Sequence, residues 1–342
     1  MKFVRQLTLL IVAFASSAFA DVVVSVDFEN RAEGQYTNDM AKEDFPKRQG
    51  ASSWYAMEQN NGENAKIVRD GDEHGMVLQL KYPKGCVGPN DKSEEGIPAC
   101  AGQVKQPLQV SAEEMWVAYD IQFEEGFEFV KGGKLPGLCG GKCYTGGNRP
   151  SVGDGWSARI MWRKDGNVVQ YLYFVDQAGT YGDDALWNLN GTAEQKQFVP
   201  GQWHRVVTRV VLNSVTTEGT GDKNGVVQSW FDGELSLDLD TLRLRDSTNQ
   251  KIDEFYLSTF HGGSDTTWAP TKDVFVRYDN FVVSTDSIAV MTAKPSAGGE
   301  GASAGESDTE SIKPVRRSIL RNDVNSGFYK NEKIYNLIGQ QL

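Results

Sequence analysis

Five side chains near the middle of the chain have types and spacings that suit proton transfer on an anionic substrate. Ser157 and Arg159 are two positions apart, and Tyr171 and Tyr173 have the same spacing in the next apolar run. Residues two apart on a strand point to the same face of a sheet. If both runs are strands, a hydroxyl, a guanidinium and two phenols share one surface, which Lys134 on the preceding loop could reach.

This set holds no carboxylate pair, no nucleophile with a histidine, and no cluster of metal ligands, so it favours proton abstraction over hydrolysis. Arg159 is the natural clamp for a substrate carboxylate, because its planar fork matches two oxygens. Tyrosine and lysine ordinarily titrate near ~10 and ~10.4, and neighbouring cations lower both values. Either tyrosine could be the base with the other as acid, or Lys134 could be the base and a tyrosine the acid. The residues leave this choice open.

Two further residues are candidates for substrate binding. Ser157 is small and is assigned a supporting role beside Arg159. His261 follows an expected strand and precedes two glycines, so it is predicted to face the substrate.

The elements that must position these residues are predicted to be strands. Apolar alternation and β-branched or aromatic residues recur in short runs, and turn sequences such as Asp165-Gly166-Asn167 separate them. Long amphipathic helices are missing. The expected fold is therefore all-β, an antiparallel β-sandwich of the jelly-roll, concanavalin-like kind. Strands are expected at 22–28, 76–82, 115–123, 157–163, 168–175, 203–212, 226–231, 252–260 and 274–283.

The two ends of the chain differ in composition from its centre. Lys2 and Arg5 precede an apolar run and the small-residue motif Ala18-Phe19-Ala20, a pattern typical of a secretory signal peptide. A secreted, extracellular protein without a membrane span is therefore expected. The predicted organisation is a signal peptide at 1–20, a β-jelly-roll domain at 21–290, a disordered acidic Gly/Ser/Ala linker at 291–312, and a basic tail at 313–342 that is disordered or serves as a docking peptide.

The four cysteines fall into two local pairs. Export permits disulfides, and proximity favours Cys86 with Cys100 and Cys139 with Cys143 among the three possible connectivities. The second pair closes a short loop beside Lys134 and is interpreted as a staple. A zinc site is not expected, because no His/Cys partner pair at metal spacing follows.

The charge of the chain is uneven. Its formal net charge is −11, and removal of Lys2 and Arg5 with the signal peptide makes it −13, which argues against general nucleic-acid binding. Between Lys131 and Lys164, however, the sequence contains seven basic residues, and Asp154 is the one acidic residue. This excess predicts a local site for an anion. A monomer is the expected state.

Three sequence pieces, in order and at matching distances, carry a family resemblance. They are GGKLPGL around Lys134, Ser-Ala-Arg ending at Arg159, and Tyr-Leu-Tyr ending at Tyr173. Over residues 120 to 283 the chain resembles the alginate and glucuronan lyases of polysaccharide lyase family 14. The resemblance implies a β-jelly roll that cleaves uronate polymers by β-elimination with no metal or cofactor.

The same resemblance implies which side chains act. Lys134, Arg159, Tyr171 and Tyr173 match the family's catalytic positions. Elimination on a uronate passes through a species close to a dianion, so positive charge and hydrogen-bond donors in a partly dry site are what the chemistry needs.

Three other functions remain as alternatives. A lectin-like module would bind an anionic polysaccharide without cleaving it. A jelly-roll glycoside hydrolase would need two carboxylates flanking the bond, for which Glu234, Asp238 and Asp240 are the candidates. A secreted adhesion protein would use the basic tail as a hook. An unsaturated uronate among the products, detected by ultraviolet absorbance, distinguishes elimination from all three.

Overall fold

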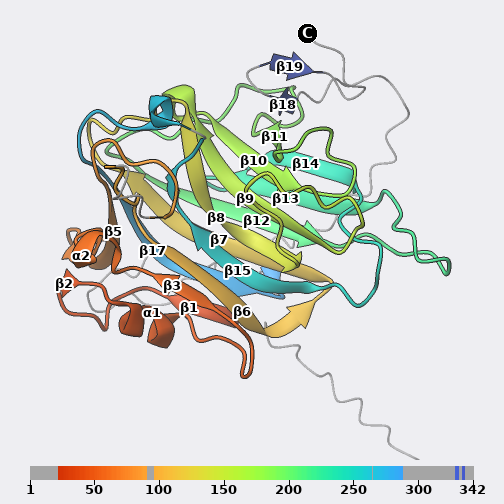
Figure 1. Cartoon of the computed structure of the whole chain (residues 1–342), viewed down its shortest axis with the longest axis horizontal. Coiled ribbons are helices and arrows are strands. Elements are labelled where there is room, and N and C mark those ends of the chain that lie inside the picture. The colour runs from red at the N-terminus through yellow and green to blue at the C-terminus, as the bar shows by residue number, and fades with distance from the viewer. Residues whose placement is uncertain (1–21, 91–95, 264, 288–327, 331–332, 336–342) are drawn as a thin grey trace, which may run out of the picture.

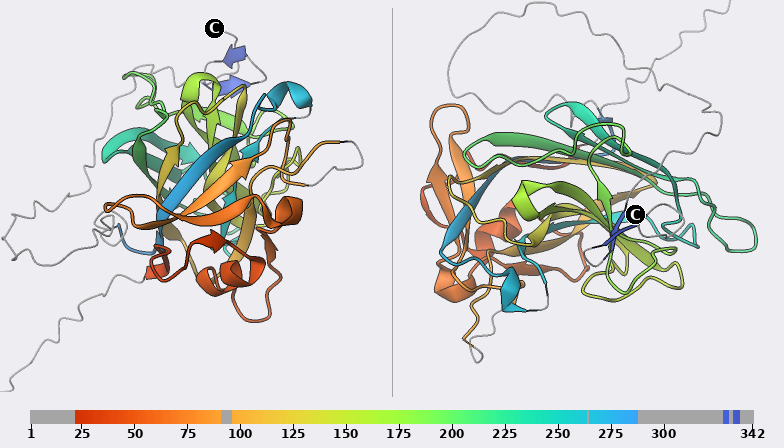
Figure 2. Two further views of the ribbon diagram at one scale, coloured as in Figure 1. Left: turned by 90° about the vertical axis from the view of Figure 1, so that its left-hand side faces the viewer. Right: turned by 90° about the horizontal axis from the view of Figure 1, so that it is seen from above.

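The computed structural model describes residues 22–90, 96–263, 265–287, 328–330 and 333–335. Two antiparallel sheets are stacked face to face (Figures 1 and 2). The all-β sandwich expected from the sequence is confirmed. The helical elements in the described part are short: α1 (Asn38–Asp44), α2 (Gln59–Gly62) and the 3₁₀ turns Lys164–Gly166 and Thr266–Trp268.

We name each sheet by a central strand. The β7 sheet has the order β14-β13-β12-β7-β17-β5-β4-β2, with β1 pairing to β17. Its strands are β1 (Val22–Val26), β2 (Gly34–Gln35), β4 (Ala65–Arg69), β5 (Met76–Tyr82), β7 (Glu114–Phe123), β12 (Trp203–Val211), β13 (Gly225–Phe231), β14 (Glu234–Leu242) and β17 (Val274–Ser284).

The β9 sheet has the order β19-β18-β11-β10-β9-β8-β15-β6-β3, with β16 pairing to β8. Its strands are β3 (Trp54–Ala56), β6 (Gln103–Ala112), β8 (Gly132–Gly141), β9 (Gly155–Arg163), β10 (Val168–Tyr173), β11 (Asp183–Leu186), β15 (Ile252–Ser258), β16 (Phe260–His261), β18 (Phe328–Lys330) and β19 (Lys333–Tyr335). All nine segments expected to be strands are strands, within a few residues at their ends. The expected strand at 252–260 is divided into β15 and β16.

The core lies between the two sheets and is rich in aromatic rings. Phe123 of the β7 sheet meets Trp162 of the β9 sheet edge to face, with ring centroids 5.4 Å apart. The Trp162 indole donates its Nε1–H to the Phe129 carbonyl at 3.0 Å, so its polar atom is satisfied. Burial of large rings of this kind supplies much of the driving force for closing a sandwich.

Strand β9 has two different faces, as the period of two requires. Its even-numbered residues, among them Ala158, Ile160 and Trp162, belong to the core between the sheets. Its odd-numbered residues therefore lie on the other face of the β9 sheet, away from the β7 sheet. Every residue proposed for proton transfer is on that other face.

Strand β8 corrects one expectation, since Lys134 lies on a strand and not on a loop. The glycines of GGKLPGL suggest a loop, but the packing requires them. A side chain at Gly133 would begin 2.0 Å from the Trp162 ring, and one at Gly137 would begin 2.2 Å from the Ala158 carbonyl. The register between β8 and β9 shifts between Leu135 and Gly137, a bulge that accommodates the intervening proline.

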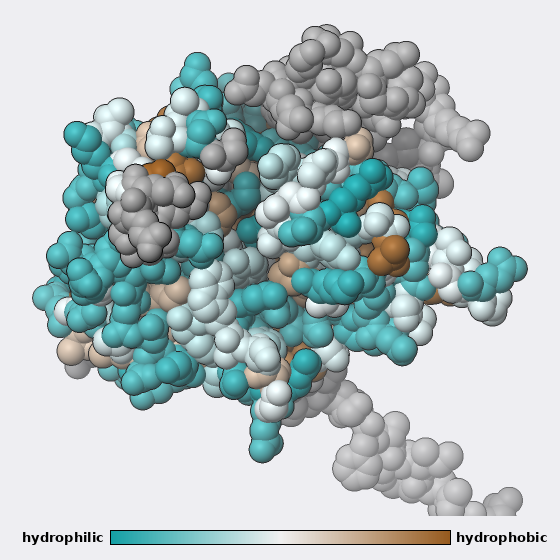
Figure 3. Space-filling view, viewed as in Figure 1, coloured by the Kyte–Doolittle hydropathy of each residue, from teal (hydrophilic) through white to brown (hydrophobic). Residues whose placement is uncertain are grey.

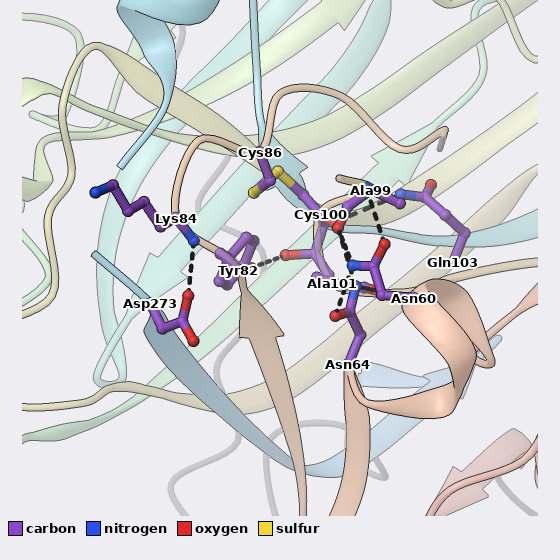
Figure 4. Close-up of a disulfide and its surroundings, with 11 residues drawn as sticks. Asn60, Asn64, Tyr82, Lys84, Cys86, Ala99, Cys100, Ala101, Gln103 and Asp273 are labelled. Atoms are coloured by element: carbon purple, nitrogen blue, oxygen red, sulfur yellow. Dashed lines mark hydrogen bonds between the residues drawn. A yellow bond between two sulfur atoms is a disulfide. The ribbon is translucent and has the colours of Figure 1, made fainter. Parts of the chain in front are cut away.

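Both predicted disulfides are present. The Cys86–Cys100 bridge, with Cα atoms 5.2 Å apart, is buried near the core. Around it, Asn64 donates from Nδ2 to the carbonyls of Ala99 and Ala101 at 3.0 Å each (Figure 4). The bridge and these hydrogen bonds hold the segment leading into β6.

The ends of the chain are described only in part. The predicted signal peptide and the linker at 291–312 lie outside the described residues. Within the basic tail, β18 pairs with β11 and β19 pairs with β18. In the described part, no helix has the length and apolar character to span a membrane. The face shown in Figure 3 is mainly hydrophilic.

Candidate active site

Three neighbouring strands of the β9 sheet bring the predicted catalytic residues together. In the register between β9 and β10, Tyr171 is paired with Arg159 and Tyr173 with Ser157. On the other side of β9, Lys134 of β8 is paired with Met161. These side chains project from the face opposite the core. We call this surface the site face.

Lys134 sits against an aromatic ring instead of a carboxylate. Its Nζ lies 3.9 Å from the centroid of the Tyr171 ring and 2.8 Å from the Met161 sulfur, which is a weak acceptor. No ion pair joins it to a described carboxylate. Burial lowers the pKa of Lys134 well below its usual range, and the charges of Arg163 and Arg159 lower it further. The site therefore favours a neutral amine at this position.

Arg159 is a buried guanidinium with unused donors. Its side chain is only 2% exposed, and Nη1 donates to the Ser258 hydroxyl at 3.1 Å. Its Nε has no hydrogen-bond partner among the described residues. Its Cζ lies 5.8 Å from the Tyr171 ring and 5.5 Å from the Tyr256 ring, so it is held between two aromatic faces. A buried cation without a carboxylate partner is costly, and an anionic ligand would compensate it.

The two phenols contact each other next to this cation. Their rings are perpendicular with centroids 5.5 Å apart, and their hydroxyl oxygens are 3.5 Å apart. Burial, followed by the neighbouring Tyr173, raises the pKa of Tyr171 far above its ordinary value. Tyr171 is therefore a protonated phenol, able to give a proton. The backbone N–H of Gly147 donates to the Tyr173 hydroxyl at 3.1 Å, so the loop after β8 lies over this part of the site.

An ion pair at the site was missed by the sequence reasoning. Arg163 donates from Nε and Nη2 to both oxygens of Asp184, at 2.6 and 2.7 Å. Its Cζ lies 5.9 Å from the Tyr171 ring centroid and 6.0 Å from that of Trp268. The sequence did contain a signal for the position of Arg163. It is an odd-numbered residue of the same strand as Arg159, so the two side chains share a face. Nothing in the sequence pairs it with Asp184.

Ser157 is on the site face and contacts the covering loop. Its hydroxyl donates to the Tyr144 carbonyl at 2.8 Å, and the Tyr144 hydroxyl in turn donates to Asp154 at 2.6 Å. Ser157 is fully buried. It therefore holds the loop that passes over Tyr173.

The structure does not bring His261 to the site face. Its ring is fully buried in the core, among the rings of Tyr82, Phe127 and Trp162 at centroid distances of 5.3 to 5.7 Å. Burial lowers its pKa to about 3, so it is neutral. The expectation that His261 contacts substrate is wrong, because β16 turns this side chain toward the other sheet.

The second disulfide borders the site. Cys139 pairs across β8 and β9 with Ser157, and its bridge to Cys143 packs against the Tyr256 ring that flanks Arg159. Cys139 Sγ lies 3.4 Å from Glu254 Oε1, but both sulfurs are committed to the disulfide. The staple therefore braces one wall of the arginine site.

The carboxylates considered for a hydrolase lie elsewhere. Glu234, Asp238 and Asp240 are on β14, at an edge of the β7 sheet. Glu234 pairs with Lys196, and Asp238 accepts a hydrogen bond from Gln228. These carboxylates do not face Lys134 or Arg159, so they cannot flank a bond held at the site face.

Comparisons with known proteins agree with this geometry. The family model for polysaccharide lyase 14 matches residues 70–281. Among solved structures, alginate lyase Aly36B is 23% identical with a TM-score of 0.58, covering 76% of this chain and 95% of its own. The marine PL-14 alginate lyase from Aplysia kurodai is 22% identical with a TM-score of 0.58, covering 77% and 99%. Alginate lyase vAL-1 from Chlorella virus is 18% identical with a TM-score of 0.55, covering 77% and 99%.

A comparison with curated protein sequences gives no match. At these identities the solved structures establish the fold alone. The family model covers more than half of the chain, and the matched region contains all the residues of the site face described above. The chain therefore belongs to polysaccharide lyase family 14 and is a polysaccharide lyase.

Proposed function

We propose that this enzyme cleaves a uronate polymer, alginate or glucuronan, by β-elimination. One observation carries the proposal. The buried Arg159 has no carboxylate partner in the described part of the chain and a free Nε, and it lies beside an amine with a lowered pKa and a phenol with a raised one. A sugar carboxylate would complete this arrangement.

The steps follow from the positions of the groups. Arg159 binds the carboxylate of one uronate and stabilises the negative charge that develops on it. The neutral amine of Lys134 takes the proton from the ring carbon that bears this carboxylate. The electron pair of that C–H bond forms a double bond between this carbon and the neighbouring ring carbon. At the same time, the bond between the neighbouring carbon and the glycosidic oxygen breaks. Tyr171 gives its proton to this leaving oxygen.

The pKa shifts support this division of roles over the reverse. A base must be unprotonated before reaction and an acid must be protonated. The lowered pKa of Lys134 and the raised pKa of Tyr171 meet these two conditions. The 3.9 Å contact between Nζ and the Tyr171 ring supports this scheme, because it brings the proposed base and acid close enough to act on one sugar. Tyr173, bound to Gly147, supports Tyr171 in this scheme.

The covering loop bears on access. Arg159, Tyr171 and Tyr173 are all nearly buried, and Gly147 and Tyr144 contact the site from above. A polymer therefore reaches the site when this loop moves. Water exclusion by the same loop, once it closes, would strengthen the charge stabilisation that Arg159 provides.

The test is a substrate panel. The purified chain is incubated with alginate, polymannuronate, polyguluronate and glucuronan, and ultraviolet absorbance reports the unsaturated uronate. Alginate is tried first, because mutants of the structurally similar Aly36B have been solved with an alginate trisaccharide and tetrasaccharide. Lys134→Ala should abolish turnover with the fold intact, and Lys164→Ala, an exposed neighbour of Arg163, is the matched control.

Three results would overturn the proposal. Absence of absorbance on every polymer, with binding retained, would indicate a lectin-like module. Saturated products with new reducing ends would indicate hydrolysis. Near-normal activity of Lys134→Ala would remove Lys134 from the mechanism.

We also propose that the enzyme is a secreted, extracellular monomer. The support is the signal-peptide pattern before Asp21 and the uneven, strongly acidic composition. Expression of the full chain should place the protein in the medium with Asp21 at its amino terminus, and light scattering should give the mass of one copy. A protein that keeps its original amino terminus would contradict secretion. The mass of a dimer would contradict the monomeric state.

A further inference from the structure

An ion pair outside the predicted catalytic set lies on the site face. Arg163 is on the same face of β9 as Arg159, and Asp184 of β11 is paired in register with Tyr171 of β10. The Arg163 guanidinium thus reaches across Tyr171 to a carboxylate two strands away, which it binds with two hydrogen bonds. Asp184 is 1% exposed. The Arg163 side chain is 25% exposed, but its two hydrogen bonds to a buried carboxylate fix the guanidinium in one place.

The fixed guanidinium is close to the amine of the site. Lys134 is opposite Met161 on β9, and Arg163 is two residues farther on the same face, which makes the two cations diagonal neighbours. Both also lie against one ring, since Nζ of Lys134 is 3.9 Å and Cζ of Arg163 is 5.9 Å from the Tyr171 centroid. Two cations at diagonal positions repel each other unless one loses its proton.

We propose that the Arg163–Asp184 pair is a positioning device for the elimination. In it, Asp184 anchors the Arg163 guanidinium against Tyr171 so that its charge keeps the neighbouring Lys134 amine free of its proton. This inference rests on the proposed function, in which Lys134 is the base. Arg163 and Asp184 themselves need not touch the sugar.

The charged and titratable groups around Lys134 support this assignment. The charges that act on Lys134 are those of Arg159 and Arg163 from β9 and of Asp184 from β11. The uncharged Tyr171 ring of β10 lies against its Nζ. On its fourth side, β16 and the following glycines present Phe260 and Gly262, which carry no charge. Both arginines favour the neutral amine, whereas Asp184 opposes them. Arg159 is expected to be engaged by the substrate carboxylate, so Arg163 is the cation that remains when the sugar is bound.

This arrangement predicts shifts of opposite sign for the two members of the pair. Removal of the Arg163 charge should raise the pKa of Lys134. In Asp184→Asn the amide oxygen can still accept a hydrogen bond from Arg163 and hold it in place, so loss of the carboxylate charge alone should lower this pKa. Coulomb's law with an effective dielectric constant of about 20, at the diagonal spacing of about 7 to 8 Å, gives about 1 to 2 pH units for Arg163→Gln. A purely structural ion pair would impair both variants alike without moving this pKa in opposite directions.

The experiment measures the pKa of Lys134 in two independent ways. The first is the acid limb of the pH profile of kcat/KM, read by absorbance on the polymer that the wild type cleaves. The second is a ¹³C NMR titration of reductively methylated lysines, with the Lys134 signal assigned by its loss in Lys134→Met. The variants are Arg163→Gln, Arg163→Lys, Asp184→Asn and the exposed control Lys164→Gln, each checked for its thermal midpoint.

The proposal expects a defined pattern. In Arg163→Gln the acid limb of the kcat/KM profile and the midpoint of the Lys134 NMR titration both move up by about 1 to 2 pH units. The activity of this variant recovers at high pH. Arg163→Lys, which keeps the charge, stays near the wild type. Asp184→Asn moves both readouts down, and Lys164→Gln moves neither. If Arg163→Gln does not fold, the downward shift in Asp184→Asn still tests the proposal.

The outcomes also separate this inference from the proposed function. An unmoved Lys134 midpoint in folded Arg163→Gln, or shifts of the same sign in both variants, overturns the inference even if the enzyme is an active lyase. A wild type that cleaves no uronate polymer overturns the proposed function, and the NMR titration still decides whether Arg163 acts on Lys134.

Discussion

Replacement of Lys134 by methionine should make the enzyme more stable while it removes the activity. Methionine has a similar length and flexibility, so it can keep the contacts with Tyr171 and Met161. What the substitution removes is a partly buried amine that has no carboxylate partner among the described residues. Burial of a polar group without a good hydrogen bond costs about 1 to 3 kcal/mol in proteins.

The expected gain at neutral pH is about 1 kcal/mol, typical of trade-offs between stability and activity at catalytic residues. For a chain of this size that is about 1.5 to 2 °C in the thermal midpoint. The gain in stability of Lys134→Met over the wild type must decrease as the pH rises. The folded-state pKa of Lys134 is lowered, so between that pKa and the ordinary value of 10.5 the unfolded chain binds a proton that the folded chain does not. Wild-type stability therefore rises with pH across this interval, and Lys134→Met lacks that rise.

The assay is urea unfolding of both proteins at pH 7 and at pH 10, together with turnover measured by absorbance. We expect kcat to fall by about 10²- to 10⁴-fold, the usual contribution of a general base. The variant should be the more stable protein at pH 7, and the gap should narrow at pH 10. Lys164→Met, at an exposed site, should change stability by less than about 0.5 kcal/mol.

The reasoning is refuted if Lys134→Met is the less stable protein at pH 7 by 1 kcal/mol or more, because the amine would then be a structural group. A stability gap that does not change with pH would show that Lys134 is protonated in the folded state. Retained turnover would exclude Lys134 as the base.

Three other substitutions test other parts of the molecule. Tyr171→Phe should lower kcat by about 10²- to 10⁴-fold with little change in KM, and an unchanged kcat would assign the acid to another group. Arg159→Lys, which loses the planar fork, should lower kcat/KM by about 10- to 100-fold; a change of less than twofold would argue against a carboxylate clamp. The double variant Cys86→Ala with Cys100→Ala opens a loop of 14 residues and should lower the unfolding free energy by about 3 kcal/mol with turnover intact, whereas loss of turnover in the folded variant would tie this staple to the site.

Local pattern was enough to predict the strands that carry the site. Alternation within the runs ending at Arg163 and Tyr173 assigned the correct face to each residue, because side-chain direction in a strand depends only on parity. The same parity rule places Arg163 with Arg159. The face of each candidate catalytic residue on β9 and β10 was therefore predictable from the sequence.

Strand β8 was not predictable from local preference, because tertiary packing decides it. Gly133 and Gly137 occupy positions where a β-carbon would overlap the Trp162 ring or the Ala158 carbonyl. Glycine there is a consequence of close strand packing, although in sequence it resembles a loop. The family pattern identified Lys134 as important, but its strand position needed the three-dimensional neighbours.

His261 shows how a short strand can mislead. In the register between β16 and β8, Phe260 is opposite Lys134 and His261 is opposite Gly133. Since Gly133 lies against the Trp162 ring, the histidine beside it enters the same aromatic core. A shift of one residue would have exposed His261 on the site face. No feature of the His-Gly-Gly sequence specifies that register.

The excess of positive charge in the sequence is resolved by the structure into different roles. Lys142 is exposed and pairs with Asp154, so it adds little to the site. Arg163 forms an ion pair with Asp184, which lies 21 residues farther along the chain on β11. Arg159 is buried and has no carboxylate partner in the part of the chain that the structure describes. A count of charged residues in the sequence gives each of these cations the same weight. Their carboxylate partners in the structure distinguish a cation that can bind a substrate from one that can only act on its neighbours. Arg159 can therefore receive the sugar carboxylate, and Arg163, whose two hydrogen bonds to Asp184 are already made, acts through Lys134.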